Sequence, residues 1–438
     1  MQFSRHLDKG LWAAADKSLY AIYGVGFMFL VIRVLPKAEL GVFVLVQNVF
    51  LVVSFLGICL GLSPLVKFIH EIKDRGALVA TAVYLELGFV VAAMPALWLL
   101  RKPFGEVLQS PEFAGLFYFV PLLFMAAFGK LLAVEIMRGL FRVRDIFWSD
   151  LSYFGLNLAL IWGLTRAGRF GTARDQLSIQ VISFAVSSVV SLALCWREVR
   201  WRWRPPREVV RRLFHFGKFL FGSGVNGQIY ERTDVFFISA FVGPAEVGVY
   251  YSAKVFLRLF DMYRQAVGML ALPLFSRLKA ESRTQDICTV FEKAIFFSQV
   301  ALTAGTLVLF VGADVLYALF YADRYTGGES FLRGLSLIGL FLAWFVLSES
   351  VLASIGRPDK SFRVRVLATV LNVALNLWLI RWLGAYGAVV ASVLATAFLA
   401  VLMTMQAKAE VQFTWHGIWK RRLDIANFLR LIMRRTRI

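Results

Sequence analysis

The chain has 438 residues, of which 59% are hydrophobic and only 17% are charged. Soluble domains average about 45–50% apolar and about 25% charged residues, so this composition excludes a soluble protein and predicts one that lies in lipid. The net charge of +20 would suit a nucleic-acid partner. Because Lys and Arg also collect on the cytoplasmic links of membrane proteins, we expect membrane topology as its cause and no nucleic-acid partner.

Twelve apolar segments approach the ~20 residues that a helix needs to cross a bilayer. In chain order they cover residues 12–35, 41–64, 78–100, 114–137, 147–165, 177–196, 217–241, 246–274, 290–311, 330–353, 364–383 and 385–406. The polar links between them are short and leave no room for a soluble domain. The sequence therefore predicts an all-α membrane protein with about twelve transmembrane helices.

The basic residues of the links set the orientation. With the N-terminus inside, the inner links carry roughly three times as many Lys and Arg residues as the outer links. We therefore expect both termini in the cytoplasm. The longest basic stretch, at 197–218, contains Pro205 and Pro206, which cannot continue a helix and favour a linker. The basic tail carries spaced apolar residues, which predicts an amphipathic helix on the inner leaflet.

Two short motifs recur in the second half at nearly the same offset. Residues 38–43, Ala-Glu-Leu-Gly-Val-Phe, reappear as residues 245–250, Ala-Glu-Val-Gly-Val-Tyr, and residues 156–160 reappear as 371–375. Related spans have the same orientation, which indicates a parallel repeat whose two lobes enclose a cavity and work by alternating access. The expected parts are an N-terminal six-helix lobe at 1–200, a basic linker at 201–216, a C-terminal six-helix lobe at 217–408 and a basic amphipathic tail at 409–438.

Ionisable side chains inside spans are costly, and they usually line a cavity or pair with one another. Within 246–274, Lys254, Arg258, Asp261 and Arg264 recur at steps of three or four, so on a continuous helix they share one face. We interpret this face as a cationic wall of the cavity, with ion pairing and snorkelling as the alternative. Two asparagines in the repeat, Asn157 and Asn372, are expected to bond between helices.

The candidate site residues form two groups, one of basic and amide side chains and one of acids. The substrate-binding candidates are Lys17, Lys130, Asn226, Gln228, Arg232, Lys254, Arg258 and Arg264. The ion-coupling candidates are the acids Asp16, Glu86, Glu231, Asp234 and Asp261. Taken singly, each acid more often serves helix packing or an ion pair. No P-loop, zinc-protease motif or nucleophile elbow occurs, and the four histidines are far apart, so we expect neither an enzyme nor a metal or other cofactor.

Several segments, taken in order, resemble a known family. The segments are residues 33–43, Asn226 and Gln228 with Asp234, residues 241–253, residues 272–278, residues 356–358, Asn372, Asn376 and residues 384–388. They resemble the polysaccharide flippases, the Wzx-type members of the MOP superfamily, which has a MATE-like fold. The resemblance covers almost the whole chain.

This resemblance implies a function. The family moves undecaprenyl-diphosphate-linked oligosaccharides across the bacterial inner membrane for surface polysaccharides such as the O-antigen of lipopolysaccharide. It implies a cationic cavity for the diphosphate and sugar, ion antiport as the driving force, and a polymerase and chain-length machinery as partners. A multidrug and toxin exporter of the same superfamily, a membrane glycosyltransferase or polymerase, and a scaffold without transport activity remain alternatives.

Overall fold

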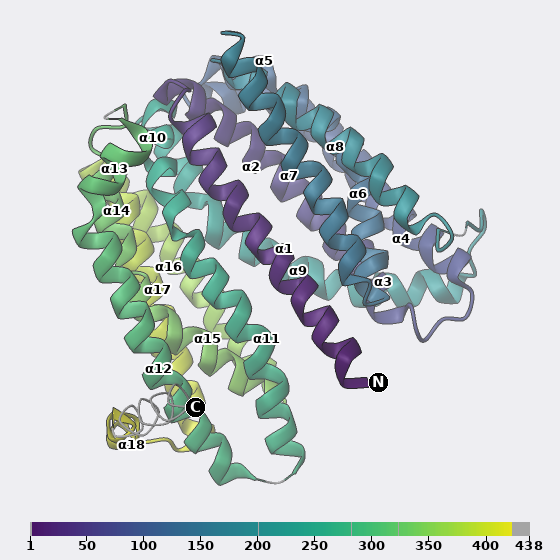
Figure 1. Ribbon diagram of the computed structural model, residues 1–438, viewed down its shortest axis with the longest axis vertical. Coiled ribbons are helices and arrows are strands. Elements are labelled where there is room, and N and C mark those ends of the chain that lie inside the picture. The colour runs from purple at the N-terminus through teal and green to yellow at the C-terminus, as the bar shows by residue number, and fades with distance from the viewer. Residues whose placement is uncertain (1, 200, 282, 323, 423–438) are drawn as a thin grey trace, which may run out of the picture. The chain divides into compact units, whose positions relative to one another are not determined.

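The computed structural model describes residues 2–199, 201–281, 283–322 and 324–422, and throughout these ranges the secondary structure is helical (Figure 1). The helices are α1 (Gln2–Phe27), η1 (Met28–Ile32), α2 (Lys37–Leu60), α3 (Leu62–Phe68), α4 (Arg75–Val107), α5 (Pro111–Leu116), α6 (Phe119–Gly139), α7 (Val143–Arg166), α8 (Ala173–Cys195), α9 (Arg207–Phe241), α10 (Pro244–Lys254), η2 (Val255–Leu257), α11 (Arg258–Ala280), α12 (Thr284–Val311), α13 (Ala313–Tyr321), α14 (Gly328–Ser336), α15 (Gly339–Ser354), α16 (Pro358–Leu383), α17 (Ala385–Val411) and α18 (Trp415–Lys420).

Every expected span falls on a helix, so the predicted all-helical class is confirmed. By length and apolar composition, eight helices of the described ranges could cross a membrane, or nine if the bent pair α14 and α15 forms one span. The expected spans that fail this test lie on α7, α9 and α10–α11. The expected spans on these helices carry ionisable groups. The count of twelve spans and the cytoplasmic location of both termini remain predictions.

The helices pack into two compact units, which are described one at a time. The first takes the described residues of Met1–Val255 together with Tyr317–Thr326, and the second takes those of Phe256–Leu316 and Gly327–Ile438. The division falls inside the eighth expected span, which is not one continuous helix. A 3₁₀ turn, η2, separates α10 from α11. Lys254 therefore lies on a different helix from Arg258, Asp261 and Arg264, and the four residues do not share the face of one continuous helix as predicted.

The two copies of the repeated motif pack against each other where α2 meets α10. A Cβ atom at Gly41 would lie 1.7 Å from the carbonyl oxygen of Pro244, and one at Gly248 would lie 2.1 Å from that of Lys37. Each glycine thus meets the backbone at the equivalent position of the other copy, which is the reciprocity that a two-fold relation requires. Only glycine permits so close an approach. The contact supports the predicted parallel repeat.

The expected linker at 201–216 is shorter than predicted because α9 already begins at Arg207, directly after two prolines. The chain before it is fixed to the first unit, since Arg202 forms an ion pair with Asp74 at the start of α4. The backbone N–H of Ala77 and the Arg202 guanidinium hold the pKa of the Asp74 carboxyl below its usual value.

The described part of the tail packs on the core of the second unit. Phe413 is 1% exposed, and its ring centroid lies 4.7 Å from that of Phe291 on α12. The Arg421 guanidinium pairs with the buried carboxyl group of Glu292 at 2.8 Å. The amphipathic helix expected at 409–438 is limited to α18 within the described ranges, and residues 423–438 of that prediction lie outside them.

Candidate functional site

Buried polar side chains of the first unit gather in two places. The Lys130 cluster consists of Asp16, Tyr20, Lys130, Ser149, Asp150 and Ser187, from α1, α6, α7 and α8. The Arg232 cluster consists of Asn48, Gln228, Arg232, Asp234, Tyr250 and Lys254, from α2, α9 and α10. Both clusters contain residues that the sequence analysis selected.

An ion pair forms the centre of the Lys130 cluster. The Lys130 ammonium lies 2.7 Å from the Asp150 carboxylate, and both side chains are more than nine-tenths buried. The ammonium also donates to the Ser149 carbonyl at 3.1 Å and to the Ser187 hydroxyl at 3.3 Å. Lys130 was predicted to bind substrate. Its buried contacts instead favour a role inside the helix bundle, because the Asp150 carboxylate already neutralises its charge.

Small residues let α6 approach α8, which contributes Ser187 to this cluster. A Cβ atom at Gly129 would lie 2.8 Å from the Leu192 side chain and 3.0 Å from that of Ser188, so α6 and α8 meet at short range. The Ser188 hydroxyl donates to the Ala126 carbonyl across the same contact. Small and hydroxyl-bearing residues are typical of helix contacts in lipid.

A second carboxyl group lies beside the ion pair. Asp16 on α1 is 8% exposed, interacts with the Asp150 carboxyl, and has one oxygen without a hydrogen-bond partner among the described residues. The Tyr20 hydroxyl donates to the other Asp150 oxygen at 3.0 Å. The ammonium groups of Lys17 and Lys130 both interact with Asp16, so two carboxyl groups and two ammonium groups lie together here. A proton taken up by either carboxyl group would change this balance by one charge.

A guanidinium group defines the Arg232 cluster. Arg232 Nε donates to Gln228 Oε1 at 2.6 Å, and its Nη1 donates to the Asn48 side-chain oxygen. Asn48 is held in turn by a 2.7 Å hydrogen bond to the Val44 carbonyl. These bonds use two of the five N–H donors of the guanidinium and leave the others for an anionic ligand.

A lysine and an acid pair within the same cluster. Asp234 is 4% exposed and accepts hydrogen bonds from Lys254 Nζ and from the Tyr250 hydroxyl, each at 2.6 Å. Lys254 also donates to the Glu231 carbonyl at 3.0 Å. Arg232 also interacts with the carboxylates of Glu231 and Asp234, so two basic and two acidic side chains lie together here. The half-buried guanidinium is the group of this cluster whose chemistry suits a phosphate or diphosphate.

The candidates on α11 belong to the second unit. On α11 of the second unit, Arg264 pairs with Asp261 at 3.2 Å, one turn beyond the half-buried Arg258. This pairing is the alternative that the sequence left open for that face.

Three further candidates lie in the first unit. The Lys17 ammonium borders the Lys130 cluster, since it interacts with Asp16 and lies 5.1 Å from the centre of the Tyr20 ring. Asn226 is half-buried on α9, and the described residues offer its side chain no hydrogen bond. Glu86 is fully buried on α4 beside Gly57, and neither carboxyl oxygen has a hydrogen-bond partner in the described part of the chain.

Six residues of the clusters were not among the candidates, namely Tyr20, Ser149, Asp150, Ser187, Asn48 and Tyr250. Asp150 and Asn48 are single polar residues whose partners lie on other helices, so the sequence offers no spacing that marks them. Tyr250 could have been selected from the sequence, because it replaces Phe43 at the equivalent position of the repeated motif. The added hydroxyl group is the one that binds Asp234.

Comparison with known proteins adds independent findings. A family model described as polysaccharide biosynthesis protein matches residues 30–327. A probable low-salt glycan biosynthesis flippase, Agl15 of Haloferax volcanii, is 24% identical over 389 residues, which cover 87% of this chain and 80% of the relative. These matches confirm the resemblance noted in the sequence.

Solved structures of low sequence identity share the fold. A lipid II flippase, MurJ, in an inward closed conformation has a TM-score of 0.76 at 12% identity, covering 97% of this chain and 92% of its own. An inward-facing multidrug resistance MATE family transporter of the MOP superfamily has a TM-score of 0.74 at 16% identity, covering 92% of this chain and 94% of its own. At these identities the likeness shows a MOP-type fold.

Proposed function

Because the chain belongs to the family of polysaccharide biosynthesis proteins, whose model matches residues 30–327, we propose that it is a flippase for a lipid-linked oligosaccharide. The curated name of the Haloferax relative, a probable glycan biosynthesis flippase, supports this proposal. The parallel repeat supports alternating access as its mechanism. The observation that carries the proposal is the Arg232 cluster, which offers guanidinium N–H donors inside the helix bundle.

A diphosphate is the part of such a substrate that this cluster fits. Arg232 is oriented by Gln228 and Asn48, so its remaining donors are fixed before a ligand arrives. An arginine binds phosphate oxygens with two parallel hydrogen bonds, which a lysine cannot do. The neutralised Lys254–Asp234 pair fixes α10 to α9 and thereby holds the site together.

The proposed setting follows from the family resemblance. The carrier is undecaprenyl diphosphate, the membrane is the bacterial inner membrane, and the product serves a surface polysaccharide such as O-antigen. A polymerase and chain-length machinery would act on the oligosaccharide after it has crossed. The proposal requires only that the substrate contain a polyprenyl diphosphate and a saccharide, whichever polyprenyl carrier the cell uses.

We assign ion coupling to the Lys130 cluster. Either of its two carboxyl groups can take up one proton, and the groups of the cluster come from four different helices. Loading or unloading that charge changes the interactions that hold α1 against α7, which is a means of biasing one conformation over another. This assignment gives Asp16 a role in coupling and Lys130 a role in positioning Asp150.

A multidrug exporter is the alternative within the same fold. Organic cations need an acidic binding site, and the half-buried Arg232 guanidinium opposes them. A membrane glycosyltransferase or polymerase needs space for a second substrate outside the membrane. The links between the described helices are short, so the proposal favours transport.

Reconstitution tests the proposal. Purified protein in vesicles is given a fluorescent polyprenyl-diphosphate oligosaccharide, and the fraction that reaches the outer leaflet is followed by quenching. Arg232→Ala should slow flipping about tenfold or more, because each charge-assisted hydrogen bond contributes about 1.5–3 kcal/mol. Arg232→Lys keeps the charge and most of the packing and should still be slow. Arg211→Ala, which removes an exposed arginine of the same helix, is the matched control and should flip at the wild-type rate.

The predicted cationic face is tested in the same assay. Lys254→Ala and Arg258→Ala should each reduce flipping if both cations contribute to the path of the head group. A well-expressed double variant that flips at the wild-type rate would remove both residues from the site. Such a result would leave the role of Arg232 to be judged on its own variants.

A further inference from the structure

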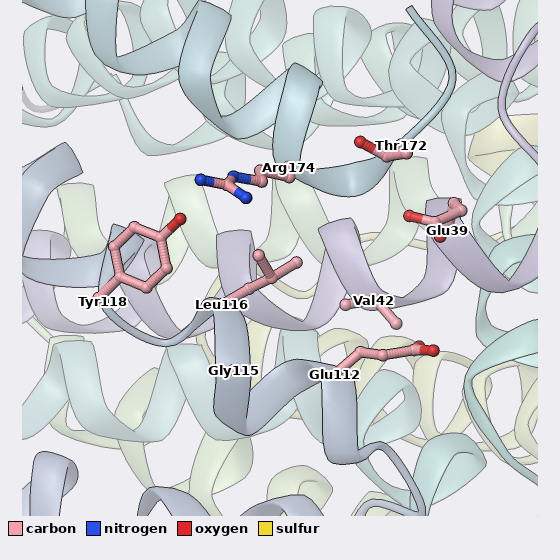
Figure 2. Close-up of a pocket in the computed structure, with 8 residues that line it drawn as sticks. All are labelled: Glu39, Val42, Glu112, Gly115, Leu116, Tyr118, Thr172 and Arg174. Carbon is pink, nitrogen blue, oxygen red and sulfur yellow. The ribbon is translucent and has the colours of Figure 1, made fainter.

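The first unit has a pocket that is separate from both polar clusters. It has a volume of about 730 Å³ and lies where α2, α5 and α8 begin (Figure 2). Small-molecule sites span roughly 300–1,000 Å³, so this volume admits a ligand of that size. The charge bias of the links assigns these helix starts to the outer side of the membrane. The lining residues used below are Glu39, Val42, Glu112, Leu116, Tyr118 and Arg174.

Hydrogen-bond donors and acceptors occupy different walls of this pocket. Figure 2 shows Arg174 and Tyr118 together at one side, and the carboxyl groups of Glu39 and Glu112 at the other. The apolar side chain of Leu116 lies between them. A few oriented polar groups around an apolar surface form the usual pattern of a small-molecule site.

Part of the pocket is rigid. Glu39 Oε2 accepts a 2.6 Å hydrogen bond from the backbone N–H of Ala173, which ties the start of α2 to the start of α8. A capping box between Thr172 and Asp175 fixes the first turn of α8, from which Arg174 projects. The side chains of Glu112 and Arg174 are exposed, so a ligand can reach them.

The balance of charge selects the kind of ligand. An anion drawn to Arg174 would meet two carboxylates, and a cation drawn to the carboxylates would meet the guanidinium. A neutral ligand rich in hydroxyl groups has no such conflict, because each hydroxyl both donates and accepts hydrogen bonds. The carboxylates would accept from its hydroxyls, and Arg174 and Tyr118 would donate to them. Its apolar C–H face would lie on Leu116.

We propose that this pocket binds a saccharide unit of the oligosaccharide after the head group has reached the outer side of the membrane. The inference rests on the proposed function, because flipping brings the glycan to this face. Glu39 of the pocket and Asn48, which binds Arg232, are nine residues apart on α2, which corresponds to about 14 Å along the helix. The pocket therefore acts on oligosaccharides of several sugars and leaves a single sugar next to the diphosphate unaffected.

Two exposed residues of the pocket allow a test that spares the fold. The variants are Glu112→Gln and Arg174→Ala in the full-length protein, reconstituted in lipid nanodiscs and in vesicles. The matched controls are Glu106→Gln, in the last turn of α4, and Arg169→Ala, just before α8, which change exposed residues near these positions that do not line the pocket. The binding probe is the glycan pool released by mild acid from the lipid-linked oligosaccharides of cells that carry the protein. Binding is measured by saturation-transfer NMR.

The expected result has two parts. Glycan signals should be strong with the wild type and both controls, and about tenfold weaker with each pocket variant, as the loss of one charge-assisted hydrogen bond predicts. In vesicles, the pocket variants should slow the flipping of a polyprenyl-diphosphate oligosaccharide and leave that of a polyprenyl-diphosphate monosaccharide unchanged.

Other results would overturn the inference. Wild-type flipping of both lipids, with pocket variants indistinguishable from their controls, would refute the pocket and leave the flippase proposal intact. Absence of flipping by the wild type would instead refute the flippase proposal, while the NMR measurement still reports on the pocket. Binding of calcium or tetramethylammonium at the pocket, without glycan signals, would assign it to a cation and refute the saccharide.

Discussion

The contact between the two copies of the repeated motif can be tested by adding a single methyl group. In Gly41→Ala, the new Cβ atom would lie 1.7 Å from the Pro244 carbonyl oxygen, where real Cβ atoms stay beyond 3.0 Å. Both sides of the contact are backbone, so no side chain can rotate away. The helices α2 and α10 must therefore separate by more than 1 Å at this point.

The cost follows from the size of this displacement. Inserting a methyl group into a close-packed contact costs about 1–3 kcal/mol, and more when the backbone must move. Alanine also gains about 0.5–1 kcal/mol over glycine in a helix. We expect Gly41→Ala to lower the free energy of unfolding by about 1–3 kcal/mol. Gly227→Ala on α9, where a Cβ would meet nothing within 4 Å, should raise it by about 0.5–1 kcal/mol.

The assay is unfolding in mixed micelles by increasing SDS, followed by tryptophan fluorescence. The two variants make the same chemical change, so the opposite signs isolate the contact from helix propensity. Stability of Gly41→Ala equal to or above that of Gly227→Ala would refute the close approach. Gly248→Ala should resemble Gly41→Ala. The double variant should cost less than the sum, because helices already separated by the first methyl group accommodate the second.

Three further predictions concern buried groups. Lys130→Met should cost about 3–5 kcal/mol by leaving the buried Asp150 carboxylate without its cation, and adding Asp150→Asn should recover most of that loss in the SDS assay; a double variant no more stable than Lys130→Met would contradict the pair. Phe413→Ala should cost about 3–5 kcal/mol and expose the tail to protease, and an unchanged digestion pattern would show that the tail is not packed. Glu86→Gln should retain ion-driven flipping, since Glu86 is not part of the Lys130 cluster. If this variant lost the ion dependence of flipping, ion coupling would be assigned to Glu86 on α4.

The helices were predictable because a long apolar run predicts a membrane-spanning helix without any knowledge of its neighbours. Each expected span falls on helical residues, including the spans on α7 and α9 that fail the test of length and apolar composition, although several spans cover more than one helix. The break at Val255–Leu257 was not predictable. A 3₁₀ turn needs no glycine or proline, and the residues at this break are apolar like those around them.

The candidate site was predictable where partners share a helix or a motif. Gln228 and Arg232 are one helical turn apart, and the structure joins them directly. The Lys130–Asp150 pair spans two helices, so only packing could reveal it. The two asparagines of the repeat show the same limit. Asn157 accepts a hydrogen bond from Tyr23 on another helix, as predicted, whereas Asn372 bonds to Asn376 within its own helix.

The central claim is that the chain moves a lipid-linked oligosaccharide across a bilayer. Its most direct test is the rate at which purified protein in vesicles transfers a fluorescent polyprenyl-diphosphate oligosaccharide between leaflets, with and without an imposed proton or sodium gradient. The account predicts transfer that one of these gradients accelerates, that Arg232→Ala slows about tenfold or more, and that Arg211→Ala leaves unchanged. Transfer no faster than in protein-free vesicles, or transfer that does not depend on Arg232, would contradict it.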